Sequence, residues 1–516
     1  MKQYEMYEMT FEYDGDEEIV AEFACDGHEP VKVYAFRSSA STITIRFYPQ
    51  YSGTYRYCIS GGINKSGALF CESAPLSDVS GCDDKGIVRA CGTHFSYDNG
   101  EWFYPFGTTV YALAHQDDEL IDQTMETLSK SPFNKVRMCV FPKHYSFNEN
   151  EPKYFAVCMD EGHEGNESVF SINTSKPCYE FWDAFENRIR QLDELGIQCD
   201  LILFHPYDRW GFADLTLEQA KEYLDYAIRR LAAFPNVWWS LANEFDLMKY
   251  SKEEWEEIAA YIHEHDPFGH LLSNHNCIEF WDFNNKDTTH VCIQVKDTSM
   301  VSGMIREYNK PLMVDECCYE GNIEYEWGNI SAFEMVNRFW MAVVQGGYCT
   351  HGETFLSDDD ILWWSKGGVL KGESPARIAF LKRIVDSLPG PIEYCGYEFT
   401  KERYDAINAD PAVADNDFWL AVARAPWDRA KGAMLTGKEY MGRSYNDKTG
   451  DEVYIKYLER KCAAVTTMNL PSDKTYDISV IDVWNMTEEK TMSGISGSVT
   501  VTLPGKEGMA VLARKI

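Results

Sequence analysis

Two polar stretches that directly follow apolar runs each contain a glutamate. The run 237–242 leads into Asn243-Glu244, and the run 311–314 leads into Glu316 two residues later. A carboxyl group where a buried strand ends is poorly solvated, which raises its pKa and suits it to donate a proton. Two such groups facing each other can cleave a glycosidic bond, because one protonates the leaving oxygen while the other attacks or stabilises the developing oxocarbenium carbon.

The region around these glutamates predicts the elements that would position them. Eight short apolar runs alternate there with amphipathic helices, at 104–113, 135–141, 198–204, 237–242, 270–273, 290–295, 311–314 and 346–350. Helix starts carry capping signals at Thr216 with Gln219, Ser251 with Glu254, Ser331 with Glu334, and Ser374 with Pro375. This alternation predicts an α/β fold, a (β/α)8 TIM barrel, whose catalytic groups lie at the C-terminal ends of its strands. A doubly wound open sheet is the alternative. It is less favoured because the glycine-rich motif GxGxxG, which follows the first strand in dinucleotide-binding sheets of this kind, is missing after the first run.

The chain on either side of this region shows strand patterns without amphipathic helices. Apolar and polar residues alternate at 42–47, and again at 418–423 and 498–503. Such alternation is typical of half-buried strands. We therefore expect an N-terminal antiparallel β-sandwich at 1–92, the catalytic barrel at 93–390, and a C-terminal antiparallel β-sandwich at 391–516.

The composition disfavours several classes of function. Lys and Arg number 48 against 82 Asp and Glu, and the formal net charge of −34 disfavours binding to nucleic acid or to an anionic membrane surface. A neutral sugar would not be repelled, and the 14% of aromatic residues includes rings that could stack on sugars. No stretch reaches the roughly 20 apolar residues that span a bilayer. The start lacks the apolar core of a signal peptide, and the 16 Cys form no CxxC pair, so we expect a reduced, cytoplasmic protein.

These motifs resemble those of the clan-A glycoside hydrolases, the retaining (β/α)8 group. The run PLMVDECCYEG is similar to the strand-seven signature of the apiosidase-like family, in which Pro opens the strand and Tyr follows Glu by three residues. FEYDG and SGTYRY near the N-terminus, and IDVWNM and SGISGSVTVTLPG near the C-terminus, resemble the family's accessory sandwiches. The resemblance implies that Glu244 is the acid/base and Glu316 the nucleophile of a retaining hydrolase that needs no cofactor.

The resemblance also implies roles for residues near the two glutamates. Asn243 would hydrogen-bond a sugar 2-hydroxyl, and Arg137 in the second strand would hold the nucleophile. An aromatic platform would follow the eighth strand, where Trp363 and Trp364 lie. The alternatives are a turn for Asn243, the outer face of the barrel for Arg137, and simple burial for the two Trp residues.

Further candidates follow the remaining runs. They are His205 and Trp210 after the third run, Asn274 and His275 after the fifth, Gln294 in the sixth, Tyr319 after the seventh, and Glu353 after the eighth. Gln294 stands where many clan members have His or Tyr, which puts the sixth strand's role in doubt. Neighbouring strand residues point to opposite faces, so we expect only one of Asp315 and Glu316 to face the site. We favour Glu316 as the nucleophile over both Asp315 and Glu320.

Two other functions remain open. One is a non-catalytic carbohydrate-binding protein on a barrel scaffold. The other is a metal-dependent barrel hydrolase using His205, His275, His351 and Glu353, disfavoured because the first strand has no HxH. The favoured hypothesis is an exo-acting enzyme without metal or cofactor, acting on a terminal neutral sugar of imported oligosaccharides or plant glycosides. The resemblance suggests apiose-, arabinose-, xylose- or galactose-type sugars, and it leaves open whether the protein is a homo-oligomer.

Overall fold

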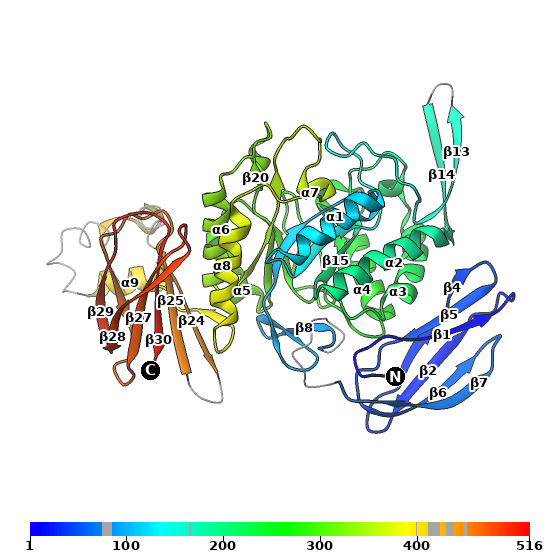
Figure 1. Cartoon of the computed structure of the whole chain (residues 1–516), viewed down its shortest axis with the longest axis horizontal. Coiled ribbons are helices and arrows are strands. Elements are labelled where there is room, and N and C mark those ends of the chain that lie inside the picture. The colour runs from blue at the N-terminus through cyan, green and yellow to red at the C-terminus, as the bar shows by residue number, and fades with distance from the viewer. Residues whose placement is uncertain (75–84, 165–166, 399, 411–423, 430–437, 447–450) are drawn as a thin grey trace. The chain divides into compact units, whose positions relative to one another are not determined.

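The computed structural model describes residues 1–516 except 75–84, 165–166, 399, 411–423, 430–437 and 447–450. The chain forms two compact units (Figure 1). One consists of Met1–Met335 with Gly347–Ala379, and the other of Val336–Gly346 with Phe380–Ile516. The strand predicted at 418–423 lies outside the described residues.

The N-terminal part of the first unit is a β-sandwich, as the alternating pattern predicts. Its strands are β1 (Tyr7–Glu12), β2 (Val20–Cys25), β3 (Val31–Tyr34), β4 (Phe36–Ser39), β5 (Thr42–Phe47), β6 (Gly53–Ser60) and β7 (Lys65–Cys71). They form two antiparallel sheets of order β1-β5-β4 and β3-β2-β6-β7. Phe23 of one sheet stacks on Phe47 of the other at 4.0 Å between ring centroids, so the inward residues of both sheets build one core. A small sheet of β8 (Val88–Cys91), β9 (His94–Tyr97) and β10 (Trp102–Phe103) follows.

The remainder of the first unit contains the barrel. Its parallel strands are β11 (Phe106–Thr109), β12 (Lys135–Cys139), β15 (Gln198–Phe204), β16 (Val237–Ala242), β17 (Leu272–Ser273), β18 (Val291–Gln294), β19 (Leu312–Glu316) and β21 (Tyr348–His351). Their order is β17-β16-β15-β12-β11-β21-β19-β18. The ends of this sheet meet, because Thr289 N–H donates to Leu272 O at 2.8 Å and Ser273 Oγ donates to His290 O at 2.6 Å. The predicted barrel is therefore confirmed.

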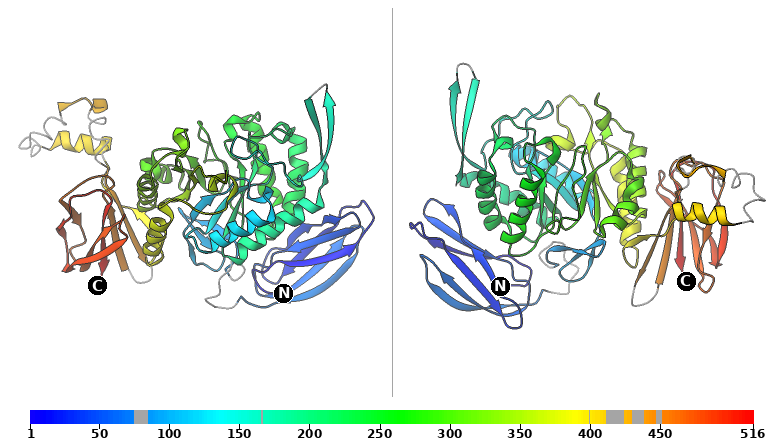
Figure 2. Two further views of the ribbon diagram at one scale, coloured as in Figure 1. Left: turned by 45° about the horizontal axis from the view of Figure 1, so that its top comes forward. Right: turned by 180° about the vertical axis from the view of Figure 1, so that it is seen from behind.

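Helices alternate with these strands along the chain, and those of the first unit lie around the barrel (Figure 2). They are α1 (Asp118–Ser129), α2 (Tyr179–Glu194), α3 (Leu217–Leu231), α4 (Lys252–His265), α5 (Val301–Tyr308), α6 (Ala332–Val344), α7 (Trp363–Lys366) and α8 (Ser374–Asp386). Complete capping boxes form at Thr216 before α3 and at Ser251 before α4, and Glu334 N–H donates to Ser331 Oγ at 3.2 Å before α6. Two further pairs of strands are β13 (Val157–Glu164) with β14 (Glu167–Pro177), a hairpin that projects from the barrel in Figure 1, and β20 (Glu320–Gly321) with β22 (Glu353–Thr354).

The C-terminal part of the chain is antiparallel. Its strands are β23 (Ile392–Tyr394), β24 (Tyr440–Asn446), β25 (Asp451–Tyr457), β26 (Val465–Asn469), β27 (Tyr476–Asp482), β28 (Thr487–Ile495), β29 (Ser498–Thr502) and β30 (Met509–Lys515), and α9 (Lys401–Ala409) follows β23. One sheet has the order β23-β24-β25-β30-β27-β28, and β26 pairs with β29. Met468, Ile478, Val501 and Val511 are fully buried between them. A second β-sandwich is thus confirmed.

Two further findings concern the helices and the cysteines of the described residues. No helix among them is both long enough and apolar enough to cross a membrane. All fifteen cysteines that the structure describes are free thiols, and the adjacent Cys317 and Cys318 are both buried. Cys317 and Cys318 are thus small buried thiols in an apolar stretch of the sequence, as expected there.

Candidate active site

Glu244 follows β16 in an unusual backbone conformation. Its φ of 60° and ψ of 57° are left-handed, which costs a residue with a Cβ about 1–2 kcal/mol. Main-chain hydrogen bonds hold the chain on both sides, since Asn243 N–H donates to Phe204 O and Phe245 N–H donates to His275 O, each at 2.9 Å. The neighbouring strands therefore impose the turn, and outliers of this kind cluster at functional sites.

A β-bulge at the end of β19 places Glu316. Ile293 pairs with Val314, but Gln294 pairs with Glu316, so Asp315 is an extra residue on β19. A bulge interrupts the alternation of side chains between the two faces of a sheet. The expectation that only one of the two acids faces inward therefore rests on an alternation that is absent here.

Both acids contact residues of the barrel strands. The Asp315 carboxylate lies 2.8 Å from Lys135 Nζ and accepts a 2.5 Å hydrogen bond from Thr350 Oγ1. Burial opposes ionisation of Asp315, but the positive charges of Lys135 and Arg137 outweigh it and hold its pKa well below the usual range. Asp315 is thus an ionised partner of two buried cations inside the barrel, and Glu316 shares one of them, Arg137.

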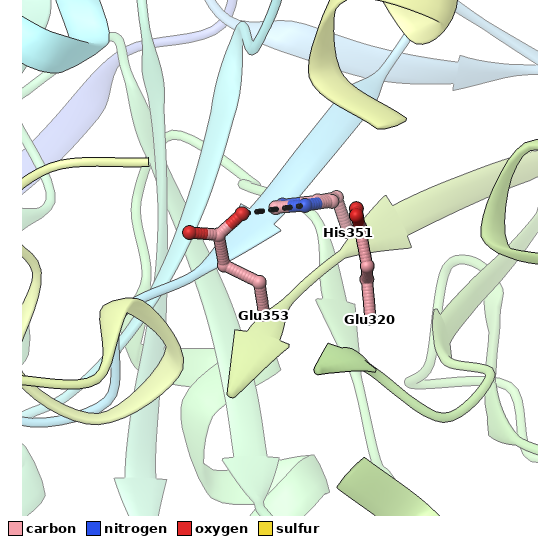
Figure 3. A group of neighbouring side chains, drawn as sticks. All are labelled: Glu320, His351 and Glu353. Atoms are coloured by element: carbon pink, nitrogen blue, oxygen red, sulfur yellow. Dashed lines mark ion pairs between the residues drawn. The ribbon is translucent and has the colours of Figure 1, made fainter. Parts of the chain in front are cut away.

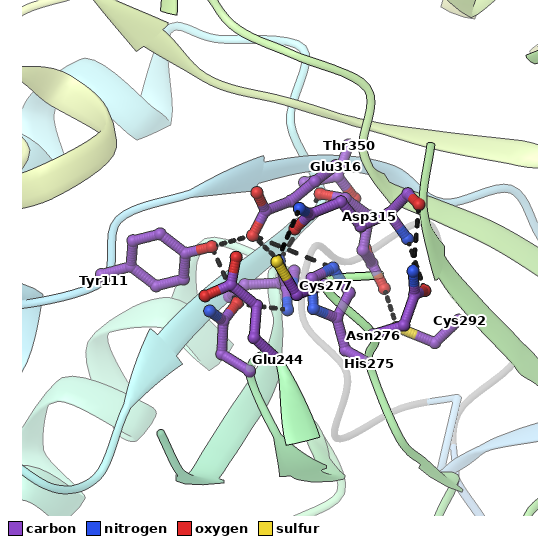
Figure 4. A network of polar contacts seen from close by, with 12 residues as sticks. Tyr111, Glu244, His275, Asn276, Cys277, Cys292, Asp315, Glu316 and Thr350 are labelled. Atoms are coloured by element: carbon purple, nitrogen blue, oxygen red, sulfur yellow. Dashed lines mark hydrogen bonds and ion pairs between the residues drawn. The ribbon is translucent and has the colours of Figure 1, made fainter. Parts of the chain in front are cut away.

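Glu316 is surrounded by hydrogen-bond donors. The Tyr111 hydroxyl donates to Oε1, Arg137 Nη1 lies 3.4 Å from the same atom, and Trp327 Nε1 donates to Oε2 at 3.2 Å. His275 Nε2 is 3.8 Å from Oε1. The side chain is only 4% exposed, so these groups fix the orientation of the carboxylate (Figure 4).

Asn243 and Arg137 connect the ends of the two glutamate-bearing strands. Asn243 Oδ1 accepts a hydrogen bond from Arg137 Nη2 at 3.3 Å and lies 2.9 Å from the Tyr111 hydroxyl. Because that hydroxyl has one proton, it donates either to Asn243 or to Glu316 at any moment. Arg137 is completely buried inside the barrel, so the structure does not place it on the outer face.

Glu244 has a different environment from Glu316. Its Oε2 accepts a hydrogen bond from the Tyr207 hydroxyl, and the residue is 7% exposed. Burial and the nearby charge of Glu316 raise the pKa of Glu244, while Lys143 acts in the opposite direction. Figure 4 shows the two carboxyl groups beside the Tyr111 hydroxyl. One carboxyl group is thus held by several donors, and the other is biased towards the protonated form.

Aromatic rings lie next to these groups. The Tyr319 hydroxyl is 3.4 Å from that of Tyr111, and the half-buried Trp364 ring lies 5.6 Å from the Tyr319 ring. Trp363 is 2% exposed, and its Nε1 donates instead to Thr108 Oγ1 at 2.8 Å. Of the two Trp residues that follow the eighth strand, the structure brings Trp364 to the site.

Four other sequence-predicted residues are held by their own neighbours. His205 Nε2 pairs with Phe141 O at 3.2 Å, and burial lowers its pKa to about 3. Trp210 is 1% exposed, with Nε1 3.4 Å from Glu151. Asn274 Oδ1 accepts from the N–H of His275 at 3.1 Å, and Gln294 N–H donates to Asn276 Oδ1 at 3.0 Å. Among the described contacts of these four side chains, none reaches Glu244 or Glu316.

Glu353 belongs to a separate buried group with Glu320 and His351 (Figure 3). One ligand atom from each residue lies within 4.8 Å of the others, a spacing that could hold a metal ion. His205 and His275 are not members of this group.

Main-chain donors already surround the two carboxylates of this group. Glu353 accepts from the N–H groups of Lys371 and Gly372, and Glu320 from those of Glu373 and Ser374, at 2.5–3.1 Å. These donors belong to the turn that opens α8, whose N-terminus carries partial positive charge. The turn therefore supplies the charge compensation that a cation would otherwise provide.

Comparison with known proteins agrees with this arrangement of the barrel. A family model described as "Apiosidase-like, catalytic domain" matches residues 90–371. The chain belongs to the apiosidase-like family. A second model, a domain of unknown function named DUF5605, matches residues 437–514 of the C-terminal sandwich. None of the curated proteins compared with this apiosidase-like chain matches it.

Solved structures resemble the apiosidase-like chain over different lengths. A candidate glycoside hydrolase from Bacteroides vulgatus is 29% identical, with a TM-score of 0.83, and the match covers 100% of this chain and 99% of that one. A family 5 glycoside hydrolase from the same organism is 14% identical, with a TM-score of 0.56, over 83% of this chain and 92% of that one. The second match shows the fold alone. The family and the full-length match identify a glycoside hydrolase.

The site of this apiosidase-like protein includes residues that sequence reasoning did not single out. Tyr111 lies near the end of the first predicted run, and Lys143 follows the second. An aromatic residue close to the C-terminal end of a barrel strand was a usable signal for Tyr111. No pattern pointed to Lys143, because its place depends on how the segment after β12 folds.

The group around Glu353 makes a prediction for stability. Burial raises the pKa of Glu353 to about 7, above its ordinary 4.5. A carboxyl group with a higher pKa in the folded state stabilises that state at low pH, and the stabilisation is lost as the pH rises through the folded pKa. We expect the free energy of unfolding to fall by up to about 3 kcal/mol between roughly pH 5 and pH 8. Glu353→Gln should reduce this fall, as measured by urea denaturation.

The matched control is Glu373→Gln, which neutralises an exposed side chain in the same turn. It should keep the pH dependence of the wild type. Equal pH dependence in all three proteins would show that Glu353 does not change its ionisation on folding.

Proposed function

We propose that this apiosidase-like chain is a retaining glycoside hydrolase in which Glu316 is the nucleophile and Glu244 is the acid/base. The observation that carries the proposal is the contrast between two neighbouring carboxyl groups. Glu316 is held by Tyr111, Arg137 and Trp327, whereas burial and the charge of Glu316 raise the pKa of Glu244. Environments that separate two carboxyl groups in this way assign one to attack and the other to proton transfer.

The proposed reaction has two steps. In the first, Glu316 attacks the anomeric carbon while Glu244 protonates the leaving oxygen, which gives a covalent glycosyl-enzyme. In the second, Glu244 removes a proton from water, and the water displaces Glu316. Arg137 and Tyr111 hold the nucleophile in place, Asn243 lies within reach of a sugar hydroxyl, and Trp364 offers a ring face beside the sugar. No step requires a cofactor.

The stereochemistry of the first product tests the proposal. The wild type is screened on nitrophenyl glycosides at equal concentration, and the product of the best substrate is followed by proton NMR before it mutarotates. We expect the anomeric configuration of the substrate to be retained, because two displacements restore it. An inverted product would exclude Glu316 as a nucleophile.

The finer features of the function belong to this proposal. The acidic chain, with a net charge of −34, favours a neutral sugar. We propose an exo-acting enzyme for terminal sugars of imported oligosaccharides or plant glycosides, in the cytoplasm. The domain boundaries at 92/93 and 390/391 remain part of the proposal.

Two alternatives give different results. A non-catalytic sugar-binding protein would bind a glycoside of the panel without turnover. A metal-dependent hydrolase would lose activity in a chelator, whereas the proposed mechanism keeps it.

A further inference from the structure

Lys143 occupies a fixed position just beyond β12. Asn148 Nδ2 donates to Lys143 O at 2.6 Å, and the N–H of the next residue, His144, donates to Tyr207 O at 2.9 Å. The side chain is only 3% exposed. The segment after the second barrel strand thus holds an ammonium group in a defined place.

Three tyrosine rings surround this ammonium group. Its Nζ lies 3.5 Å from the centroid of the Tyr111 ring, 4.2 Å from that of Tyr207 and 5.1 Å from that of Tyr145. The hydroxyl of Tyr111 contacts Glu316, and the hydroxyl of Tyr207 contacts Glu244. The ammonium group therefore lies beside both rings that hold the two glutamates.

Among the residues that the structure describes, the ammonium group has no oxygen partner of its own. Within the described part of the chain, no residue accepts a hydrogen bond from Lys143 Nζ or forms an ion pair with it. Contacts with ring faces compensate a buried cation only in part, because they leave its N–H groups without acceptors. The free protein must satisfy these donors with water, and a bound ligand can replace that water with an oxygen of its own.

The charges at this end of the barrel indicate which kind of oxygen. Asp315 pairs with Lys135 and Glu316 with Arg137, so both acids of β19 already have cationic partners other than Lys143. A substrate carboxylate would add a further negative charge next to Glu316. A hydroxyl group would accept from the ammonium without adding charge.

We propose that Lys143 is a substrate-binding residue whose ammonium donates a hydrogen bond to a hydroxyl oxygen of the neutral sugar lying between Glu244 and Glu316. This inference rests on the proposed function and adds a residue that selects the sugar. The same positive charge favours loss of the proton from Glu244, so its removal lets Glu244 stay protonated to higher pH.

Monodeoxy substrates test the hydrogen bond. The probe is the nitrophenyl glycoside that the wild type hydrolyses fastest, together with derivatives that each lack one hydroxyl group. For Lys143→Met we expect kcat/KM on the parent glycoside to fall about 10- to 100-fold, the range of a lost charge-assisted hydrogen bond. For one deoxy derivative, kcat/KM of the wild type should fall by a similar factor relative to the parent glycoside. For Lys143→Met, kcat/KM should hardly differ between that derivative and the parent, since the substitution and the missing hydroxyl remove the same contact.

The pH profile supplies a second readout. The basic limb of kcat/KM should move to higher pH in Lys143→Met and stay in place in Lys143→Arg, which keeps the charge. The matched control is Lys153→Met, an exposed lysine in the same segment, which should match the wild type throughout. Melting temperatures of all variants show whether each is folded.

The outcomes separate this inference from the function on which it rests. If the wild type hydrolyses no glycoside of the panel, the proposed function is overturned, and the role of Lys143 with it. The second outcome is an active wild type in which the losses of kcat/KM from Lys143→Met and from every deoxy derivative multiply independently, and in which Lys143→Met leaves the basic limb of the pH profile in place. Lys143 is then a packing residue, and only this inference is overturned.

Discussion

Glu316→Gln is expected to lower kcat by at least about 10⁴-fold, a loss of about 5.5 kcal/mol of transition-state stabilisation. An amide cannot form the covalent glycosyl bond, so the first displacement has no nucleophile. The change keeps the shape of the side chain, and an amide oxygen can still accept from Tyr111 and Arg137. The folded structure should therefore survive while turnover does not.

Two measurements isolate this effect. Initial rates on the best nitrophenyl glycoside give kcat, and binding of the same glycoside to the inactive variant should remain within about tenfold of the wild-type KM, since little ground-state binding is removed. The matched control is Glu324→Gln, which neutralises an exposed glutamate in the segment after β20 and should keep full activity. A kcat for Glu316→Gln within tenfold of the wild type would remove Glu316 from the mechanism.

Much of the fold was predictable because its signals are local. Periodicity and capping act within a few residues, and so the runs 198–204 and 237–242 became β15 and β16 with unchanged bounds. The capping boxes at Thr216 and Ser251 likewise fix where α3 and α4 begin. The position of Glu244 just beyond the end of β16 follows from these elements.

What sequence reasoning missed depends on contacts between distant segments. The bulge that turns Asp315 inward exists only in the pairing of β19 with β18. Glu353, a candidate substrate-binding residue, accepts hydrogen bonds from the turn that opens α8, and this contact is between segments that no local pattern connects. Periodicity gives no information on the irregular segments after strands, so neither Lys143 nor the choice of Trp364 over Trp363 was accessible from it.

Glu244→Ala should lower kcat/KM most for glycosides whose leaving group needs protonation, and least for those whose leaving group is a stable anion. For an alkyl glycoside, whose leaving oxygen must be protonated, we expect kcat/KM to fall about 10³- to 10⁴-fold. For a dinitrophenyl glycoside, whose leaving group departs as a stable anion, the fall in kcat/KM should be less than about tenfold. The basic limb in the pH profile of kcat/KM should also disappear in this variant. In the wild type that limb reports deprotonation of Glu244, whose pKa is raised by burial and by the charge of Glu316.

The same variant should separate the two steps of the reaction. With the dinitrophenyl glycoside, Glu316 still forms the glycosyl-enzyme, but no base activates water, so a burst of dinitrophenolate should precede slow turnover. Azide, a nucleophile that needs no base, should speed that turnover and yield a glycosyl azide of retained configuration. The matched control is Glu253→Gln, an exposed glutamate of α4, which should show neither effect. Equal losses for the alkyl and dinitrophenyl glycosides, with no burst, would mean that Glu244 does not transfer the proton and that another group near the leaving oxygen does.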